Sequence, residues 1–487
     1  MSEQLLDKSV WEKKYFDGDW KDAPGMIPVR EPATGESLGT AGGGTPELAV
    51  KLTEQAAAAQ PAWAATPAEE RARIMREAAR VIEQHQKEIM DFIVRETGGV
   101  GPKAGYEIAI ATGELYHSAA LLIQPIGEIL PQTNAERMSM AIRVPVGVVS
   151  VITPWNVPLV LAMRSVAPAL ALGNAVVLKP DHQTPVTGGY VLARAFEMAG
   201  VPKGVFSVIP GGPDVGEALV TAPVVRLVTF TGSSAVGRKV GEMAWRLLKK
   251  VSLELGGNSP MIVLDDADLD AAASCGAWGS FLHQGQVCMA TSRHIVHKKV
   301  AAEYLKKLAE HAEHLPVGDP FREHVAIGPL ISEKQLARVS GIVDDSVKAG
   351  ATLVTGGPGK GLFYKPTVLG NVKPGIRAYD EEIFGPVAPV TIAEDDDHAV
   401  ELANGTGYGL AAAVQTSSVD RGMRIARRIH AGMVHVNDQT IADHPGIPMG
   451  GMGASGNGSR FGSTTNLDEF TEWQWITVGA TPVKYPF

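Results

Sequence analysis

The chain has 487 residues, of which 45% are hydrophobic and 20% are charged, a composition typical of folded globular proteins and too apolar for a disordered one. Its net charge is −9 and no basic run exceeds a pair of Lys or Arg residues, which excludes the charge footprint of a nucleic-acid-binding protein. Two cysteines exclude a disulfide framework and a structural zinc site, and they fit a reducing compartment.

No targeting or membrane segment is expected. The first residues, MSEQLLDKSVWEKKYFDGDW, are charged and lack the apolar run of a signal peptide. The most apolar stretch, residues 157–178, is interrupted by Pro158, Arg164, Pro168 and Asn174, which disqualifies it as a membrane span. We therefore expect a soluble, cytoplasmic protein with several domains.

The predicted elements change in kind along the chain. Residues 46–98 repeat apolar positions at helical spacing, and residues 127–145 read as a β-hairpin that projects from the body. From residue 146 to 255, Val-, Ile- and Leu-rich strands alternate with helices, which indicates a doubly wound parallel α/β sheet. A second α/β pattern runs from about residue 259 to 446. The C-terminal segment is rich in β-formers and can add a strand to the hairpin.

Cys288 is the candidate nucleophile. Cysteines on apolar segments usually pack in cores, and Cys275 fits that interpretation. Cys288 instead follows a turn formed by Gln284, Gly285 and Gln286, and polar residues come after it. Such a setting exposes a thiol near backbone N–H groups.

Two polar residues end predicted strands. Glu254 is followed by a leucine and two glycines, so the chain turns at the carboxyl edge of a parallel strand, where ligands bind in open α/β sheets. A carboxyl group partly desolvated there has the raised pKa that a general base needs, whereas the alternative is a solvated strand end. Asn156, between prolines, is either a turn residue or a donor to an oxyanion.

Two further signals fit a phosphate-bearing ligand. The segment 230–237, FTGSSAVG, joins a Val-rich strand to a helix, and its glycine and helix N-terminus favour a bound anion. This pattern alone is weak, because ordinary βα turns look the same. Lys179 ends another strand, where it is either a ligand to ribose hydroxyls or a surface lysine.

Seven motifs together resemble the aldehyde dehydrogenase superfamily, in its order and approximate spacing: TPWN, LKP, FTGSSAVG, LELGGNSP, GQVC, EEIFGPV and PMGGMGASG. Cys288 follows Glu254 by 34 residues, which is similar to the family's interval, and the match runs from about Pro28 to the C-terminus. Each motif is weak by itself, but all seven in order are very specific.

The resemblance implies a mechanism without a metal. Cys288 attacks the aldehyde to form a thiohemiacetal, and the Asn156 side chain with the Cys288 N–H holds the oxyanion. Hydride transfer to nicotinamide gives a thioester, which water activated by Glu254 hydrolyses. Lys179 binds the adenosine ribose, Ser233 the pyrophosphate and Glu382 the nicotinamide ribose. The residues that the resemblance implies for cofactor binding are Thr153, Pro154, Trp155, Lys179, Gly212, Phe230, Thr231, Gly232, Ser233, Leu255, Gly256, Glu382 and Phe384.

The sequence differs from the family pattern at one position that bears on the choice between NAD and NADP. Many NAD-preferring members have a glutamate three residues after the ribose-binding lysine, and here His182 stands at that position. A histidine excludes a 2′-phosphate less strongly than a carboxylate, although Asp181 can partly compensate. We expect NAD as the cofactor, with NADP possible.

The expected substrate rests on a resemblance to the benzaldehyde and vanillin dehydrogenase branch, which is less specific than the match of the catalytic motifs. Val157, Leu161 and Met289 are the candidates for the substrate pocket, with simple core packing as the alternative. No Arg pair suits a dicarboxylic semialdehyde, although Arg164 is a candidate single anion anchor or a surface ion-pair partner. The alternatives are the same chemistry on a semialdehyde or aliphatic aldehyde, a CoA-acylating relative, and a non-catalytic protein on the same fold.

The expected architecture is α/β, with a Rossmann-like cofactor domain, an α/β catalytic domain and a β-hairpin oligomerisation extension. Residues 1–125 and 146–255 form the NAD(P)-binding domain, residues 256–450 the catalytic domain, and residues 126–145 and 468–487 the extension. Exposed strand edges usually must be covered, so we expect a homodimer or a tetramer built from two dimers.

Overall fold

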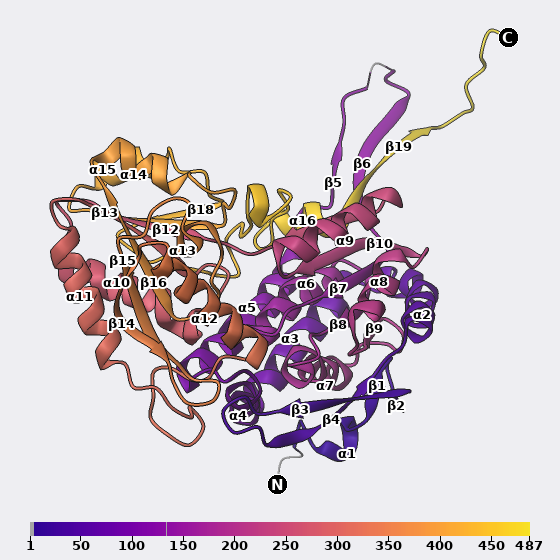
Figure 1. Cartoon of the computed structure of the whole chain (residues 1–487). Coiled ribbons are helices and arrows are strands. Elements are labelled where there is room, and N and C mark those ends of the chain that lie inside the picture. Colours follow the sequence, from indigo (N-terminus) through magenta and orange to yellow (C-terminus); the bar gives the residue numbers. More distant parts are fainter. Residues whose placement is uncertain (1–3, 133) are drawn as a thin grey trace.

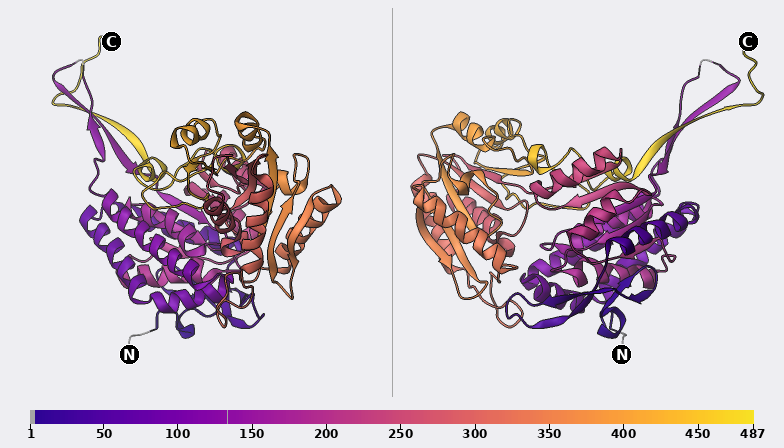
Figure 2. Two further views of the ribbon diagram at one scale, coloured as in Figure 1. Left: turned by 90° about the vertical axis from the view of Figure 1, so that its left-hand side faces the viewer. Right: turned by 45° about the vertical axis from the view of Figure 1, so that its right-hand side comes forward.

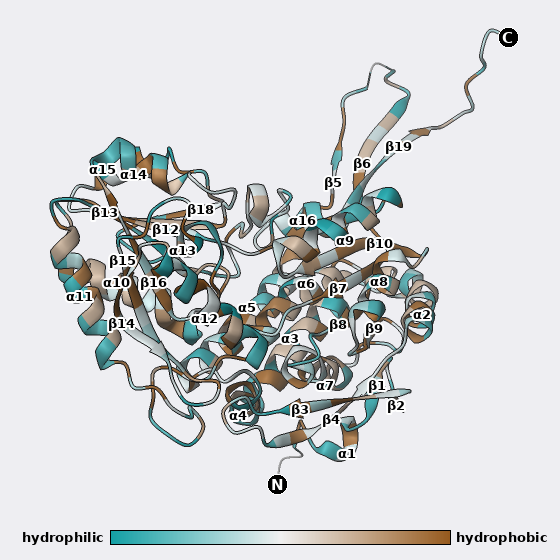
Figure 3. Cartoon of the chain, viewed as in Figure 1, coloured by the Kyte–Doolittle hydropathy of each residue, from teal (hydrophilic) through white to brown (hydrophobic). Residues whose placement is uncertain are grey.

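The computed structural model describes residues 4–132 and 134–487. Two α/β bodies lie side by side, and a β-sheet arm projects away from them (Figures 1 and 2). Hydrophobic residues concentrate on the strands and inner helix faces, as the hydropathy colouring shows (Figure 3). Within the described residues, no helix is long and apolar enough to cross a membrane.

The first body is built on a seven-stranded sheet in the order β11-β10-β7-β8-β9-β1-β2. Neighbours from β11 to β9 are parallel, whereas β1 pairs antiparallel with β9 and with β2. The strands are β1 (Lys14–Phe16), β2 (Trp20–Asp22), β7 (Val148–Ile152), β8 (Ala175–Lys179), β9 (Phe206–Val208), β10 (Val225–Thr231) and β11 (Lys250–Glu254). This is the doubly wound sheet predicted from the sequence, extended by two short strands that the sequence analysis missed.

Helices cover both faces of this sheet, which is why β7 and β8 are buried along their whole length. One face packs against α2 (Pro46–Ala64), α8 (Pro213–Thr221) and α9 (Ser234–Arg246). The other packs against α6 (Pro158–Ala171) and α7 (Val191–Ala199), the last of which continues a π-helical turn, η1 (Val186–Tyr190). Outside them lie α3 (Ala68–Gln84), α4 (Gln86–Thr97) and α5 (Gly101–Leu121), which pack mainly on other helices.

The strand order reverses at β7, because the chain proceeds to β8 and β9 on one side and returns to β10 and β11 on the other. At such a switch point the loops after adjacent strands leave in opposite directions and open a crevice at the carboxyl edge. The loops that begin at Thr153 and Gly232 therefore lie at the natural ligand site of this sheet.

The second body has its own seven-stranded sheet, in the order β14-β15-β16-β13-β12-β17-β18, in which only β14 is antiparallel to its neighbour. Its strands are β12 (Ser259–Val263), β13 (Thr291–His297), β14 (Thr352–Pro358), β15 (Tyr364–Gly370), β16 (Val387–Ala393), β17 (Ala411–Gln415) and β18 (Met433–Val436). Its helices are α10 (Leu269–Phe281), η2 (Leu282–Gly285), α11 (Ala301–His314), α12 (Glu333–Lys348), α13 (Arg377–Asp380), α14 (Asp396–Ala403) and α15 (Val419–Ala426).

The arm is a three-stranded antiparallel sheet in the order β19-β6-β5. It consists of β5 (Gly127–Ile129), β6 (Arg137–Pro145) and β19 (Thr471–Gly479), and β19 pairs with β6 from Thr471 opposite Pro145 to Gly479 opposite Arg137. The remaining elements are α1 (Lys8–Trp11), β3 (Gly25–Arg30), β4 (Ser37–Gly43), η3 (Gly453–Ser455) and α16 (Thr465–Phe470). The C-terminal strand thus extends the hairpin.

Candidate active site

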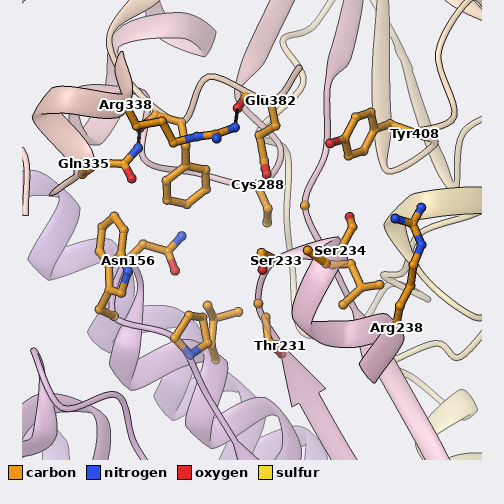
Figure 4. Close-up of a pocket in the computed structure, with 18 residues that line it drawn as sticks. Asn156, Thr231, Ser233, Ser234, Arg238, Cys288, Gln335, Arg338, Glu382 and Tyr408 are labelled. Atoms are coloured by element: carbon orange, nitrogen blue, oxygen red, sulfur yellow. Dashed lines mark hydrogen bonds between the residues drawn. The ribbon is translucent and has the colours of Figure 1, made fainter. Parts of the chain in front are cut away.

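A cavity of about 480 Å³ lies between the two bodies, at the carboxyl edge of the first sheet (Figure 4). The first body contributes the loops after β7, β10 and β11 together with the first turns of α9, and the second contributes the Cys288 loop, α12 and the segment after α13. The lining residues are Pro154, Trp155, Asn156, Leu161, Thr231, Gly232, Ser233, Ser234, Ala235, Arg238, Leu255, Gly256, Cys288, Gln335, Arg338, Glu382, Phe384 and Tyr408.

The turn before Cys288 is strained and firmly held. His283 and Gln284 have φ angles of 51° and 57°, in the left-handed region that non-glycine residues rarely adopt. The Gln284 side chain donates hydrogen bonds to the Gly98 and Pro329 carbonyls, at 2.6 and 2.9 Å, which ties the turn to its surroundings. Gly285 approaches the Gly385 carbonyl so closely that an added Cβ would lie 2.1 Å from it. The turn therefore presents Cys288 to the cavity.

Asn156 is fixed from both bodies. Its side-chain Nδ2 donates to the Gln286 carbonyl at 2.9 Å, and its own backbone carbonyl accepts a hydrogen bond from Lys103 Nζ, also at 2.9 Å. Lys103 in turn forms a buried ion pair with Glu107. One N–H of the Asn156 amide is left to point at a ligand, because an amide nitrogen carries two donors. Asn156 lines the cavity with Cys288, as an oxyanion hole requires.

Negative groups surround the Cys288 thiol. Burial raises its pKa to about 12, and the carboxylates of Glu382, Glu254 and Asp443 add to the increase. Burial also raises the pKa of Glu254 well above its ordinary value, against the opposing charges of Arg460 and Arg164. The thiol is therefore protonated until a base takes its proton.

Glu254 ends β11 behind the cavity and does not belong to its lining. Its side chain is buried, and among the described residues neither carboxylate oxygen makes a hydrogen bond of good geometry. A carboxyl group without fixed partners and with a raised pKa has the properties of a general base near neutral pH.

The first turn of α9 forms an anion site. Ser233 is the N-cap, with Oγ accepting a hydrogen bond from the Val236 N–H at 3.4 Å, and the residues on both sides of it line the cavity. The free N–H groups of a helix N-terminus and the helix dipole attract phosphate. Lys179 is buried at the end of β8. Burial lowers the pKa of Lys179, while Asp181 and Asp214 oppose that shift.

Glu382 and Phe384 close the opposite side of the cavity. Glu382 accepts a hydrogen bond from the Gly257 N–H at 2.9 Å, and burial raises its pKa to about 7. Phe384 has a φ of 57° and packs edge-on against Trp155 with ring centroids 5.4 Å apart. Gln335 donates to the Phe384 carbonyl and Arg338 to the Glu382 carbonyl, so α12 fixes this loop (Figure 4).

The structure brings together most of the residues that the sequence singled out. Cys288, Asn156 and nine of the predicted cofactor residues line the cavity. Thr153, Lys179, Gly212 and Phe230 lie outside its lining, although all belong to the carboxyl edge of the first sheet. The sequence analysis missed Ser234, Ala235, Arg238, Gln335, Arg338 and Tyr408. Ser234 adjoins Ser233, and Arg238 follows Ser234 by four residues on the same helix face, whereas nothing in the sequence places α12 here.

A smaller cavity, of about 50 Å³, adjoins the other side of Cys288. It shares Asn156, Leu161 and Cys288 with the larger cavity, so the two meet at the thiol. All three predicted pocket residues, Val157, Leu161 and Met289, belong to its lining. The others are Lys103, Tyr106, Glu107, Asn156, Val160, Arg164, Leu282, His283, Val287, Cys288, Ile441, Asp443 and Met449.

Arg164 is neither on the surface nor available as a simple anion anchor. Its side chain is buried, with Nε donating to Glu114 at 3.0 Å and Nη2 donating to Asp443 at 2.6 Å. Two carboxylates already face its charge, so a negatively charged substrate would meet a nearby anion as well as the guanidinium.

Comparison with known proteins gives a consistent result. A family model described as "Aldehyde dehydrogenase family" matches residues 20–476. The chain is 51% identical over 485 residues to a vanillin dehydrogenase of Amycolatopsis sp. and 49% identical to an NAD(+) benzaldehyde dehydrogenase of Pseudomonas putida, each match covering 99% of this chain and 100% of the relative. A salicylaldehyde dehydrogenase of Pseudomonas putida, solved with salicylaldehyde, matches at a TM-score of 0.94 and 34% identity, over 98% and 99% of the two chains. The resemblance and the fold expected from the sequence are thereby confirmed.

Proposed function

The chain belongs to the aldehyde dehydrogenase family, and we propose that it oxidises aromatic aldehydes to carboxylic acids with NAD. The observation that carries this proposal is that two cavities share Cys288 in their linings. The larger is lined by apolar side chains and by polar groups that suit a dinucleotide, and the smaller is narrow and largely apolar. The names of the similar proteins, which act on vanillin, benzaldehyde and salicylaldehyde, support an aromatic substrate.

The residues of the larger cavity fit NAD. The N-terminus of α9 suits the pyrophosphate, and the buried Lys179 has an ammonium group that needs hydrogen-bond acceptors such as ribose hydroxyls. Glu382, held on the Gly257 N–H, supplies acceptor oxygens for the second ribose, and Phe384 offers a flat apolar surface. When bound, NAD supplies the acceptor for the hydride that leaves the substrate.

The smaller cavity suits a flat apolar ring. Val157, Leu161, Met289, Ile441 and Met449 supply aliphatic and thioether groups, which pack well against aromatic faces. The aldehyde carbon then lies at Cys288, where the two cavities meet.

The chain's own residues account for the remaining chemistry. The Cys288 thiol gives its proton to a water molecule, which carries it to solvent, and Sγ attacks the carbonyl carbon, whose C=O π electrons move to the oxygen and make it an oxyanion. The free N–H of the Asn156 amide and the Cys288 backbone N–H donate to that oxygen. Collapse of the oxyanion expels the hydrogen of the aldehyde carbon as hydride, for which bound NAD would be the acceptor, and leaves a thioester on Cys288. Glu254 takes a proton from the water that attacks this thioester, the C–S bond breaks, and the Cys288 sulfur regains a proton as the carboxylic acid departs.

We also propose that the chain forms a homodimer through the arm. Large apolar side chains are exposed there, including Ile129 at 80% and Trp475 at 69%. The arm is only three strands wide, and its outer strands β19 and β5 have free edges. A second copy would cover both features. Sedimentation should give a dimer or larger for the full chain and a smaller species for Trp475→Glu.

Initial rates of NADH and NADPH formation test the proposed activity. The substrates are benzaldehyde, vanillin, succinic semialdehyde and a short alkanal, each with the wild type and with Cys288→Ala. The proposal requires that an aromatic aldehyde gives the highest kcat/KM and that Cys288→Ala is inactive. A leading semialdehyde or alkanal would refute the aromatic assignment, and activity in Cys288→Ala would refute the mechanism. Stimulation by CoA would indicate the acylating chemistry instead.

A further inference from the structure

Two buried ion pairs break the apolar wall of the smaller cavity. The first, Lys103 with Glu107, is engaged with the backbone of Asn156 and Leu159. The second is a corner formed by Arg164 and Asp443. Both residues line the cavity, and both are buried, with only 5% and 6% of their side chains exposed. Arg164 Nη2 donates to Asp443 Oδ2 at 2.6 Å, and Arg164 Nε donates to Glu114 Oε1 at 3.0 Å. Ions this far from water are stable only when most of their hydrogen-bonding capacity is used.

At Arg164 and Asp443 part of this hydrogen-bonding capacity is unused. Asp443 Oδ1 is buried and has no hydrogen-bond partner in the part of the chain that the structure describes. Arg164 Nη1 likewise makes no hydrogen bond to a described residue, since only Nε and Nη2 are engaged. The Tyr106 hydroxyl is not a partner for Oδ1, because it donates to the Asp443 backbone carbonyl at 3.1 Å. Two residues that line the cavity therefore offer an unpaired acceptor, Asp443 Oδ1, and a donor outside the two ion-pair hydrogen bonds, Arg164 Nη1. The other unpaired acceptor of this network, Glu114 Oε2, belongs to a residue that does not line the cavity.

A hydroxyl group is the substituent that matches this pair. Its hydrogen can be donated to a carboxylate oxygen while its oxygen accepts from a guanidinium nitrogen. An unsubstituted ring leaves Oδ1 unpaired in a dry site, and a methoxy group can accept but cannot donate. A carboxylate on the ring would be repelled by Asp443.

We propose that Asp443 and Arg164 select aromatic aldehydes that carry a hydroxyl group on the ring, with the phenolic O–H donating to Asp443 Oδ1 and Arg164 Nη1 donating to the phenolic oxygen. This inference rests on the proposed function, because it names the ring substituent of the substrate bound at Cys288. Buried hydrogen-bonding groups discriminate strongly against ligands that leave them unpaired.

The test compares kcat/KM for 3- and 4-hydroxybenzaldehyde, benzaldehyde and 4-methoxybenzaldehyde. For the wild type, at least one hydroxybenzaldehyde should exceed benzaldehyde by about 10-fold or more, and the methoxy compound should not share the gain. In Asp443→Leu this ratio should fall to about 1, and in Asp443→Asn, which is isosteric, it should fall to an intermediate value.

Glu114→Gln is the matched control. Glu114 belongs to the same ion-pair network but does not line the cavity, so its substitution should leave the hydroxyl-to-unsubstituted ratio unchanged. A ratio measured within one preparation is independent of how much of each variant folds. It also cancels any effect of the Asp443 charge on the Cys288 thiol, which both substrates experience.

The possible outcomes separate this inference from the proposed function. If benzaldehyde is oxidised but neither hydroxybenzaldehyde is preferred, or if the preference persists in Asp443→Leu, the hydroxyl assignment is wrong while the aromatic activity stands. If Glu114→Gln loses the preference as fully as Asp443→Leu does, the ion-pair network rather than the cavity contact is responsible, and the assignment is also wrong. If no aromatic aldehyde is oxidised, the proposed function itself fails.

Discussion

The ion pair beneath Asn156 offers a sharp test of how the oxyanion-hole residue is held. Lys103 and Glu107 are almost fully buried on one face of α5, and Lys103 Nζ also donates to the Asn156 carbonyl. Lys103→Met keeps the length of the side chain but removes its charge. Glu107 then retains the backbone N–H donors of Leu159, at 3.2 Å, and Val160, but no cation. Burial already raises the pKa of Glu107, so the loss of its partner leaves an uncompensated charge or forces protonation.

The expected magnitude follows from that geometry. Breaking a buried pair by removing one partner costs about 3–5 kcal/mol, so Lys103→Met should lower the urea midpoint clearly. Because Asn156 also loses its carbonyl contact, kcat should fall by about 10- to 100-fold, which is typical for a catalytic group displaced by a fraction of an ångström. The KM for NAD should change little, since Lys103 does not line the larger cavity.

The double variant Lys103→Met/Glu107→Gln separates charge from packing. It removes both charges at nearly constant volume, and neutral replacements for whole buried pairs are often tolerated. We expect the urea midpoint to recover most of the loss while kcat stays low, because the contact to Asn156 is still missing. An unchanged midpoint and kcat in Lys103→Met would refute the reasoning. A double variant as unstable as the single one would assign the loss to packing.

Four further results are expected. Asn156→Ala removes one oxyanion donor, so kcat should fall by roughly 10²–10³ at an unchanged thermal midpoint; activity above a tenth of wild type would contradict that role. Glu254→Gln should release a burst of NADH equal to the enzyme and then turn over slowly, whereas an unaltered steady rate would exclude Glu254 as the base. Folding raises the pKa of Glu254, so its protonated carboxyl group contributes fully to the stability of the fold below its ordinary pKa, and this contribution is lost as pH rises toward the folded pKa. The thermal midpoint of Glu254→Gln should therefore exceed that of the wild type at alkaline pH but not at acidic pH. Asp181 accepts a hydrogen bond from the Gln183 N–H, and its negative charge acts on Lys179 at the expected ribose site. Because a negative charge there repels a 2′-phosphate, Asp181→Asn should raise the ratio of kcat/KM with NADP to kcat/KM with NAD, and His182→Glu should lower it. Changes of the opposite sign would refute this view of the ribose site.

Sequence alone predicted the parts of the site that follow from the parallel sheet. Asn156 and Ser233 lie in loops that follow strands, and in a doubly wound sheet the loops after the parallel strands gather at one edge. Cys288 was singled out by the polar turn before it, although the strain at His283 and Gln284 was not visible in the sequence. The short strands near the N-terminus were missed because β1 and β2 have only three residues each and show no clear alternation.

Buried charges were the main feature that the sequence concealed. Lys103, Glu107 and Arg164 lie on helices, where periodicity favours a solvated position for charged residues. Their burial depends on partners distant along the chain, such as Asp443, which comes from a loop of the second body. Helix α12 reaches the cavity for a similar reason, because its position is set by packing in the second core rather than by any local pattern.

The placement of these charges explains why the site depends on oriented N–H groups. The carboxylates of Glu382, Glu254 and Asp443 raise the pKa of the thiol, and the same field opposes negative charge on the thiohemiacetal oxygen. A cation beside the thiol would ease both steps, but Arg164 is already engaged with two carboxylates. We therefore propose that the oxyanion is stabilised by fixed dipoles, namely the Asn156 amide and the Cys288 N–H. Their value lies in being held in place before the charge forms, which is what the Gln286 and Lys103 contacts to Asn156 accomplish.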